Sequence, residues 1–191
     1  MYIIVIIGEG MKFYKENAKS YIEQTISLDM SPQYEFVKKY LKEDSKILDV
    51  GFGSGRDMLH FKKEGYDVYG IDLEDKFVKH AKELGLNVEQ GNVLTYKSSK
   101  KYDLIWCCAS LLHLEFNDIK NAINNLKTLL SDDGVIYISL KYGDFEGDIG
   151  GRYFTYINDD KLNKLDLNII EKTVTVGINN QNLKWLNLII K

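Results

Sequence analysis

A short apolar segment that runs directly into a glycine-rich turn constrains this chain more than any other feature. Residues 46–50 read Lys-Ile-Leu-Asp-Val and residues 51–55 read Gly-Phe-Gly-Ser-Gly. The apolar run predicts a buried strand, and glycines allow the backbone to approach a ligand closely. A helix is expected from Arg56, with unpaired N–H groups facing the polar part of that ligand. The segment therefore predicts a strand–turn–helix unit with a site for a nucleotide-like ligand.

The rest of the chain alternates short apolar runs with helical stretches. Further strands are expected at 68–71, from Val88, at 104–106 and at 135–140. Gly65 and Gly85 stand where left-handed caps would end helices, and an apolar stripe of period 3.6 predicts a helix over 119–130. This alternation predicts a parallel sheet covered by helices on both faces.

The end of the chain changes character. Residues 169–176 and 183–190 are strand-like runs joined by a connection of hairpin length. We therefore expect an α/β, Rossmann-like, doubly wound sheet of seven strands, mostly parallel, with a C-terminal antiparallel hairpin. A dehydrogenase would instead continue with another βαβ half.

Length and composition predict one domain. The 191 residues are 45% hydrophobic and 28% charged, as in ordinary globular proteins. Within residues 1–191 we expect an N-terminal helical lid over 12–42, including a helix capped at Ser31-Pro32 that runs to about Leu41, and a ligand-binding core over 43–191.

The first ten residues stand apart from this pattern, which needs nothing before Met11. Residues 2–7 are apolar, without a basic flank, and too short for a secretion signal or a membrane span. They form either an extra edge strand or a non-native extension, because Gly8-Glu9-Gly10 can be encoded by a purine-rich, ribosome-binding stretch before a true start at Met11. Detection of Tyr2 to Gly10 by mass spectrometry of the natively expressed protein would exclude the second hypothesis.

The net charge and the cysteines indicate where the protein resides and which partners it can bind. The formal net charge is −3, and no Lys/Arg stripe is present, which disfavours duplex nucleic acid. Cys107 and Cys108 are adjacent and cannot form an ordinary disulfide. We expect a cytoplasmic protein with no membrane partner and no metal site.

Two acidic or amide positions follow the glycine turn at regular intervals. Asp72 comes 23 residues after Asp49, at the end of the second predicted strand, where a carboxylate can accept hydrogen bonds from both ribose hydroxyls. Alternatively, it caps the helix that starts near Glu74. Asn92 comes 20 residues further, and its carbonyl can accept a bond from an adenine amino group. The nicotinamide fingerprint is not matched, since its third glycine is replaced by Arg56.

The D-x-G-x-G-x-G pattern at 49–55 resembles the first motif of the class I S-adenosylmethionine-dependent methyltransferases. In that family the acidic residue and the turn receive the amino-acid end of the cofactor, which the resemblance assigns to Asp49 and the glycines. Phe52 and Asn92 depart from the family pattern, which has a smaller residue and commonly Gly-Asp there. The predicted cofactor-binding residues are Asp49, Gly51, Phe52, Gly53, Gly55, Arg56, Asp72, Leu73, Asn92, Val93, Cys108, Tyr14 and Tyr21.

Residues 102–114 resemble the segment that leaves the fourth strand in small-molecule members of the family. Ligands of open α/β sheets bind at the carboxyl ends of strands, so 107–110 are expected to face the sulfonium. His113 is a candidate general base, or alternatively a histidine that packs and hydrogen-bonds within a helical turn. The cysteines are expected to be small buried residues rather than nucleophiles, because the adjacent proline of cytosine-C5 enzymes is missing.

Two further segments are candidates for substrate and cofactor contacts. In the glycine-containing loop expected at 141–157, Tyr142, Arg152 and Tyr153 are predicted to contact substrate, with an ordinary solvated loop as the alternative. Tyr14 and Tyr21 resemble the tyrosine-rich lid helix of relatives. They can attract a sulfonium through cation–π contact or simply pack in the core.

The resemblance implies methyl transfer from S-adenosylmethionine, with S-adenosylhomocysteine as product, to a small-molecule acceptor by direct displacement. By analogy with tellurite- or thiol-methylating relatives, the acceptor is expected to be a small molecule that is methylated on a heteroatom. Cys107 to Ser110 replace the (D/N/S)-P-P-(Y/F/W) motif of amino-methylating DNA enzymes. The alternatives are a non-catalytic cofactor-binding partner protein, an RNA or protein methyltransferase, and a nicotinamide oxidoreductase.

Overall fold

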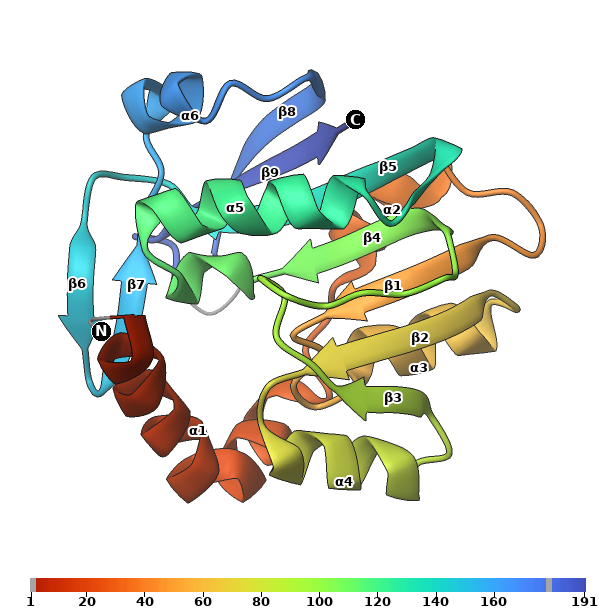
Figure 1. The fold of residues 1–191 in the computed structure, drawn as a ribbon, viewed down its shortest axis with the longest axis horizontal. Helices are drawn as coiled ribbons and strands as arrows, with labels where there is room; N and C mark the ends of the chain where they lie inside the picture. The colour runs from red at the N-terminus through yellow and green to blue at the C-terminus, as the bar shows by residue number, and fades with distance from the viewer. Residues whose placement is uncertain (1–2, 178–179) are drawn as a thin grey trace.

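A seven-stranded sheet forms the centre of the protein in the computed structural model, which describes residues 3–177 and 180–191, with side chains from Lys12 onward (Figure 1). The strand order is β3-β2-β1-β4-β5-β9-β8. Strands β3 to β5 are parallel, and β9 is antiparallel to both β5 and β8. The strands are β1 (Lys46–Val50), β2 (Asp67–Asp72), β3 (Asn87–Gln90), β4 (Tyr102–Cys108), β5 (Leu130–Lys141), β8 (Ile169–Val176) and β9 (Lys184–Ile190). The predicted fold class and C-terminal hairpin are confirmed.

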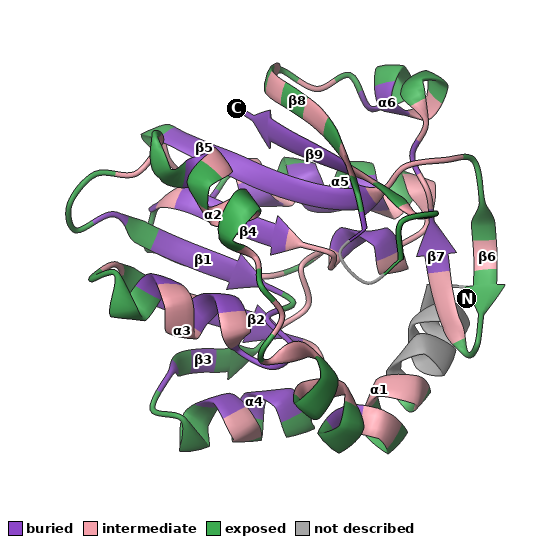
Figure 2. Ribbon diagram, turned by 180° about the vertical axis from the view of Figure 1, so that it is seen from behind, coloured by how far each residue is buried: buried purple, intermediate pink, exposed green. Residues whose placement is uncertain are grey.

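Helices cover both faces of this sheet. One face packs against α5, and the opposite face packs against α2, α3 and α4 (Figures 1 and 2). The helices are α1 (Ile3–Thr25), α2 (Ser31–Lys38), α3 (Arg56–Lys63), α4 (Asp75–Glu83), α5 (Phe116–Lys127) and α6 (Asp159–Leu165), with a 3₁₀ turn at Leu111–His113. In the described part of the chain, no helix combines the length and apolar character that a bilayer span requires.

The central strands are buried because their side chains are apolar on both faces, as expected for a parallel sheet. Leu104, Ile105 and Trp106 of β4 are fully buried. The Trp106 ring stacks on Tyr137 of β5 with ring centroids 4.1 Å apart. Figure 2 shows this buried centre beneath the partly exposed helices.

The predicted helix ends are confirmed at two glycines. Gly65 and Gly85 have φ values of +95° and +70°, in the left-handed region, directly after α3 and α4. The predicted end of the helix after Pro32 was wrong, because α2 ends at Lys38 rather than Leu41. Ser31 is not the cap residue either: its N–H and hydroxyl both donate to Asp29 Oδ1.

The segment predicted as a loop at 141–157 contains a hairpin instead. Its strands are β6 (Glu146–Ile149) and β7 (Arg152–Thr155), which pair antiparallel. Gly150 and Gly151 both have positive φ, and a two-residue hairpin turn with positive φ at both positions matches the twist of its strands. Because both strands are short and carry several charged residues, hydrophobic period did not identify them. β7 lies against α1 (Figure 1).

The N-terminal segment is helical. Helix α1 begins at Ile3, so the edge-strand interpretation of residues 2–7 was wrong. Tyr2 itself lies outside the described residues. A translation start at Met11 stays a prediction, and so do the boundaries of the lid and core.

Candidate functional site

A cavity opens at the carboxyl ends of β1, β2 and β4 and is closed on one side by α1. Ligands of open α/β sheets bind at this edge, where the strand order reverses. The lining residues come from the ends of β1 and β2, the segments after β3 and β4, the start of α4, helix α1 and strand β7. They are Tyr14, Tyr21, Val50, Gly51, Gly53, Ile71, Asp72, Leu73, Glu74, Phe77, Gly91, Asn92, Val93, Ala109, Ser110, Leu111, His113, Leu114 and Tyr153.

The structure brings ten of the predicted residues into this wall, namely Tyr14, Tyr21, Gly51, Gly53, Asp72, Leu73, Asn92, Val93, His113 and Tyr153. Seven others lie outside it: Asp49, Phe52, Gly55, Arg56, Cys108, Tyr142 and Arg152. Seven other lining residues were missed, although most lie at or near a predicted strand end or in the first turn of α4: Val50, Ile71, Glu74, Phe77, Gly91, Leu111 and Leu114. Their nearness in the sequence to the predicted strand ends was the signal that could have identified them.

Both the backbone conformation and the lack of room for a side chain require glycine in the turn after β1. Gly51 has φ +72°, and a Cβ on it would lie 2.6 Å from Ser110 Cβ. Gly53 has φ +53°, and a Cβ there would lie 3.0 Å from the Tyr21 ring. Both positions therefore need glycine to keep the backbone against the turn after β4 and against α1.

Phe52 does not crowd the cavity. Its ring is buried and points toward β2, where a Cβ on Gly70 would lie 2.8 Å from Phe52 Cδ1. The absence of a side chain at Gly70 makes room for the aromatic ring. Gly70 is thus the residue that accommodates the larger side chain in the turn.

Asp72 fastens the glycine turn to the end of β2. Its Oδ2 accepts the Gly53 N–H at 2.9 Å and its Oδ1 accepts the Glu74 N–H at 2.9 Å. Burial raises the pKa of Asp72 to about 6. It is not the cap of α4, because Glu74 occupies the cap position and accepts the Lys76 N–H itself. The carboxylate faces the cavity, where its remaining lone pairs can accept hydroxyl groups.

Asn92 is placed in the wall, but its side-chain oxygen already has a donor. Asn92 Oδ1 accepts the Leu94 N–H at 2.9 Å. An amide oxygen has two lone pairs, so one remains for a ligand amino group.

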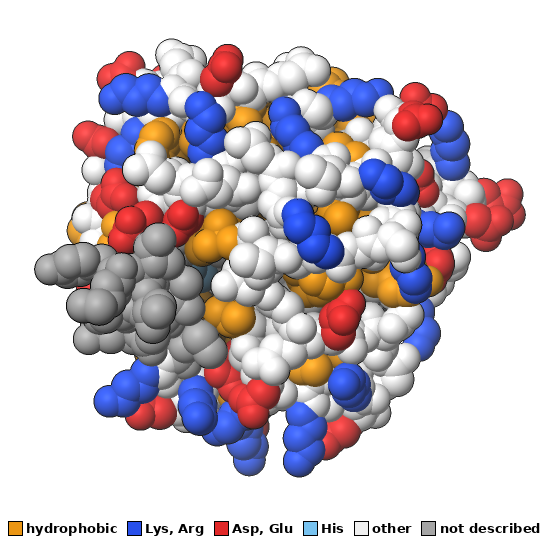
Figure 3. Space-filling view, viewed as in Figure 1, with side chains coloured by type: hydrophobic (Ala, Val, Ile, Leu, Met, Phe, Trp, Pro, Cys, Tyr) orange, Lys and Arg blue, Asp and Glu red, His pale blue; other side chains and the backbone are white. Residues whose placement is uncertain are grey.

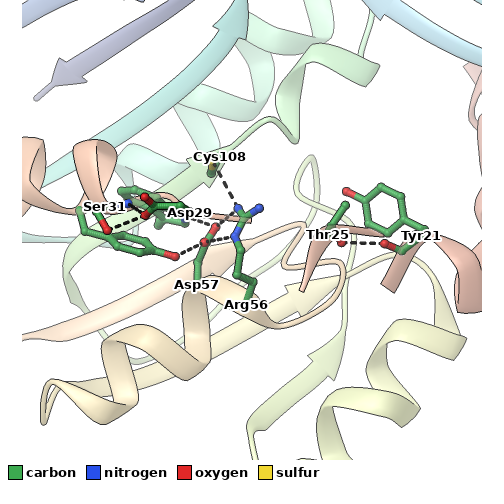
Figure 4. A network of polar contacts seen from close by, with 9 residues as sticks. Tyr21, Thr25, Asp29, Ser31, Arg56, Asp57 and Cys108 are labelled. Atoms are coloured by element: carbon green, nitrogen blue, oxygen red, sulfur yellow. Dashed lines mark hydrogen bonds and ion pairs between the residues drawn. The ribbon is translucent and has the colours of Figure 1, made fainter. Parts of the chain in front are cut away.

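Asp57 lies beneath the turn at the centre of a buried polar network (Figure 4). It accepts two bonds from Arg56, at 2.7 and 2.8 Å, one from the Tyr34 hydroxyl at 2.6 Å, and one from Trp106 Nε1 at 2.9 Å. Burial alone would raise the pKa of Asp57, but the hydrogen bonds and charge of Arg56 outweigh it and lower the pKa. Arg56 was predicted to bind cofactor, and the structure instead uses both bonded nitrogens for Asp57.

Asp49 lies near this ion pair with one oxygen unused. Its Oδ2 is buried and has no hydrogen-bond partner in the described part of the chain. Burial, together with the charge of Asp57, raises the pKa of Asp49 well above its ordinary value. The Arg56 guanidinium is paired with Asp57, and Asp49 has no ion pair of its own among the described side chains. An ammonium group near Asp49 would supply the missing donor and the missing positive charge.

The two cysteines are free thiols on β4. Burial raises the pKa of both Cys107 and Cys108, which keeps them protonated. Arg56 Nη2 lies 4.0 Å from Cys108 Sγ (Figure 4). This environment agrees with the predicted role as small buried residues and not with that of a thiolate nucleophile.

His113 is held between β7 and α1. Its Nδ1 lies 2.8 Å from the Tyr153 carbonyl oxygen, which can only accept, so Nδ1 carries the proton. Nε2 must then accept the Tyr14 hydroxyl, 2.8 Å away. Burial lowers the pKa of His113 to about 4, so the ring is neutral at pH 7. The geometry favours the packing interpretation over the general base.

The tyrosines of α1 form an aromatic wall. The Tyr14 and Tyr21 rings meet edge to face at 5.3 Å, and Tyr21 lies 5.3 Å from Phe77. Burial raises the pKa of both hydroxyls. Neutral aromatic rings in a cavity wall suit a cationic ligand.

The three predicted substrate residues are placed differently. Tyr153 lines the cavity, and its hydroxyl lies 3.1 Å from Glu146 Oε1. Tyr142 lies outside the wall and donates to Asp159 Oδ2 at 2.9 Å. Arg152 lies behind Tyr14, with its guanidinium 4.7 Å from the centroid of Phe13. Within residues whose side chains are described, no cluster of His, Cys, Asp and Glu is suited to a metal ion.

Comparison with known proteins places this site in a family. Residues 47–134 match the model of a methyltransferase domain. The chain is 36% identical over 111 residues to ribosomal protein L11 methyltransferase of Dictyoglomus turgidum, covering 55% of this chain and 36% of the relative. It is 34% identical over 106 residues to ubiquinone biosynthesis O-methyltransferase of Actinobacillus pleuropneumoniae, covering 49% and 44%. The chain thus spans less than half the length of these curated relatives.

Solved structures share the fold at low identity. The 1,6-didemethyltoxoflavin-N1-methyltransferase of Burkholderia thailandensis, with 1,6-didemethyltoxoflavin and S-adenosylhomocysteine bound, superposes with a TM-score of 0.75 at 17% identity, covering 98% of this chain and 87% of that one. An S-adenosylmethionine-dependent methyltransferase of Methanosarcina mazei gives a TM-score of 0.70 at 19% identity, covering 86% and 99%. This fold, the methyltransferase domain matched at residues 47–134 and the glycine turn between Asp49 and Asp72 support a class I S-adenosylmethionine-dependent methyltransferase.

Proposed function

We propose that the protein transfers the methyl group of S-adenosylmethionine to a small-molecule acceptor by direct displacement. The observation that carries this proposal is one continuous cavity wall, which runs from Asp72 and Asn92 to His113 and Tyr153. Groups suited to the cofactor therefore share an enclosed space with residues of a separate hairpin. Holding two reactants in line within such a space is the main contribution an enzyme makes to a displacement.

The residues of the wall, together with Asp49 just outside it, fit the parts of this cofactor. The unpartnered Asp49 oxygen and the narrow turn at Gly51 suit an α-ammonium and its carboxylate, Asp72 suits the ribose hydroxyls, and Asn92 suits the adenine amino group. When bound, the cofactor supplies an electrophilic methyl group on a sulfonium. Tyr14 and Tyr21 provide aromatic surface for that positive charge and exclude water from one side.

The surface supports a small acceptor over a nucleic acid. Figure 3 shows basic and acidic side chains interspersed over the face it displays, without a continuous basic stripe. A nicotinamide oxidoreductase is disfavoured because Arg56, at the position of the third fingerprint glycine, is committed to Asp57. One relative is named for a ribosomal protein and another for ubiquinone biosynthesis, so both protein and small acceptors belong in the first assay.

Calorimetric titration of the purified protein tests the cofactor part of the proposal. We expect S-adenosylmethionine and S-adenosylhomocysteine to bind and NADH not to bind. A transfer assay with radiolabelled methyl groups then compares a panel of small thiols, phenols and amines with ribosomal protein L11. Methylation of L11 in preference to every small acceptor would refute the small-molecule proposal, and binding of NADH alone would refute the whole proposal.

Substitutions in the glycine turn test whether its close packing is needed for cofactor binding. Replacing Gly51 by alanine is expected to weaken S-adenosylhomocysteine binding about tenfold, because the new Cβ would meet Ser110 and shift the turn. Gly85→Ala is the matched control: its φ of +70° is similar, but no atom lies within 4 Å of the new Cβ. It should cost about 1–2 kcal/mol of stability and leave binding unchanged. Ser110→Gly should partly restore binding to the Gly51 variant, and failure of that rescue would contradict the steric explanation.

Cofactor binding should depend on pH through Asp72. Its pKa is raised to about 6, and only the ionised carboxylate accepts both ribose hydroxyls while holding its backbone donors. Affinity for S-adenosylhomocysteine is therefore expected to be full at pH 7.5 and to fall as the pH drops through about 6. Titrations between pH 5 and 8 would measure this. The same decline in Asp72→Ala would assign it to another group.

A further inference from the structure

We propose that the methyl acceptor carries an anionic group, a carboxylate or a phosphate, and that Arg152 and Lys141 hold it. This inference rests on the proposed function and adds the substrate class. Lys141 ends β5, next to the end of β4, and Arg152 begins β7. The two cations therefore come from the sheet edge and from the hairpin that stands beside it.

Both cations lie against the same aromatic ring. Lys141 Nζ is 3.7 Å from the centroid of Phe154, and Arg152 Cζ is 5.2 Å from it. Burial and the charge of Arg152 lower the pKa of Lys141, which shows that the two positive charges repel each other. An arrangement that keeps two like charges together is unfavourable unless a negative charge joins them.

Neither cation has a carboxylate partner among the side chains that the structure describes. Arg152 Nε is buried and makes no hydrogen bond there. Arg56 and Lys161 differ, although 17% and 18% of their side chains are exposed. Arg56 is paired with Asp57, and Lys161 with Asp144 and Glu146. Lys141 and Arg152 are partly buried, and since a charge withdrawn from water without a partner is costly, the pair fits an anionic partner supplied from outside.

The pair is close to the cavity. Burial raises the pKa of the Tyr14 hydroxyl, and the charge of Arg152 together with a side-chain hydrogen bond from it opposes that rise. After burial, the charges of Arg152 and Lys141 contribute to the low pKa of His113. Tyr14 and His113 both line the cavity and are hydrogen-bonded to each other. Neither cation lines the cavity itself, so an anion held by them would lie beside Tyr14 and His113, next to the end of the cavity formed by α1 and β7 and away from the adenine side at Asn92.

The donor groups of Arg152 and Lys141 favour oxyanions as ligands. A guanidinium presents paired N–H donors that match a carboxylate or phosphate, and an ammonium adds a point charge. Hydrogen bonds to charged groups are about twice as strong as those between neutral groups. An acceptor with such a group should bind at least tenfold more tightly than a neutral molecule of the same shape.

Matched ligand pairs test this inference on the full chain saturated with S-adenosylhomocysteine. Benzoate is compared with benzamide, and phenyl phosphate with phenol, by ligand-observed NMR titration. In the unaltered protein at least one anion should bind ten or more times more tightly than its neutral partner. The carboxylate and phosphate pairs distinguish the two anion classes.

Variants assign any preference to the two cations. Arg152→Gln and Lys141→Met keep most of the side-chain volume and should each reduce the preference at least fivefold, and together they should abolish it. Lys79→Gln, an exposed residue of α4, is the matched control and should leave it unchanged. S-adenosylhomocysteine affinity, measured on every variant, should stay within twofold and also reports folding.

The outcomes are separable. No preference for either anion in the unaltered protein, or a preference that survives the double variant, would overturn the anionic acceptor. Failure to bind S-adenosylhomocysteine at all would overturn the proposed function instead. Inorganic phosphate provides a second readout: it should raise the melting temperature of the unaltered protein more than that of the double variant.

Discussion

Asp57→Ala is expected to lower the free energy of unfolding by about 3–5 kcal/mol, because breaking a buried ion pair leaves an uncompensated charge. In this protein the charge is the Arg56 guanidinium, and the Tyr34 hydroxyl and the Trp106 indole also lose their acceptor. Urea unfolding at pH 7, followed by tryptophan fluorescence and circular dichroism, measures the effect.

An exposed ion pair provides the control. Glu35 and Lys38 lie 3.3 Å apart on α2, with 70% and 65% of their side chains exposed. Glu35→Ala should therefore cost less than about 0.5 kcal/mol. A loss below about 1 kcal/mol for Asp57→Ala would mean that solvent reaches Arg56 and that the buried network contributes little to stability. A double replacement of Arg56 and Asp57 by Met and Leu should recover part of the stability, since apolar residues of similar volume often replace buried pairs well.

Asp72→Ala should weaken binding of S-adenosylmethionine about 100-fold or more. On the proposed ribose contact, the variant would lose two charge-assisted hydrogen bonds, each worth about 1.5–3 kcal/mol, and it releases the Gly53 N–H that positions the turn. Calorimetry at pH 7.5 measures the affinity. Asp75→Ala, which removes a neighbouring carboxylate outside the cavity wall, should change it less than twofold.

Stability must be recorded alongside affinity for this variant. Alanine removes a carboxylate whose raised pKa marks it as unfavourably buried, but it also leaves the Gly53 and Glu74 N–H groups without their acceptor. These effects oppose each other, so the melting temperature should move little. An unchanged affinity in a folded Asp72→Ala protein would contradict the ribose-binding role.

The features predictable from the sequence were those encoded within one segment. The strand, turn and helix from 46 to 63, the hairpin at the C-terminus and the position of Asp72 each follow from a local pattern, and the structure confirms these elements. The packing role of the cysteines also followed from local sequence. Each of these features needs only the period of apolar residues and the place of a glycine or an acid.

The features that escaped prediction depend on residues far apart in the chain. Asp57 reads as an ordinary first-turn acid of a helix until Tyr34 and Trp106 converge on it. His113 acquires its tautomer from Tyr14 and Tyr153, which lie on two other elements. Arg56 was assigned to the cofactor because no sequence pattern reveals that its neighbour Asp57 is buried with it.

The division of the cavity wall between sheet and periphery has a consequence for how acceptors change. The groups suited to the cofactor lie at the ends of β1 and β2, whereas Tyr14 and Tyr153 belong to α1 and to the β6–β7 hairpin. That hairpin pairs only with itself in the described structure and makes no strand of the main sheet. On the proposed function, a graft of another hairpin between Lys141 and Asn158 that keeps the buried Phe154 and Thr155 is expected to alter which molecule is methylated while the methyl donor stays the same.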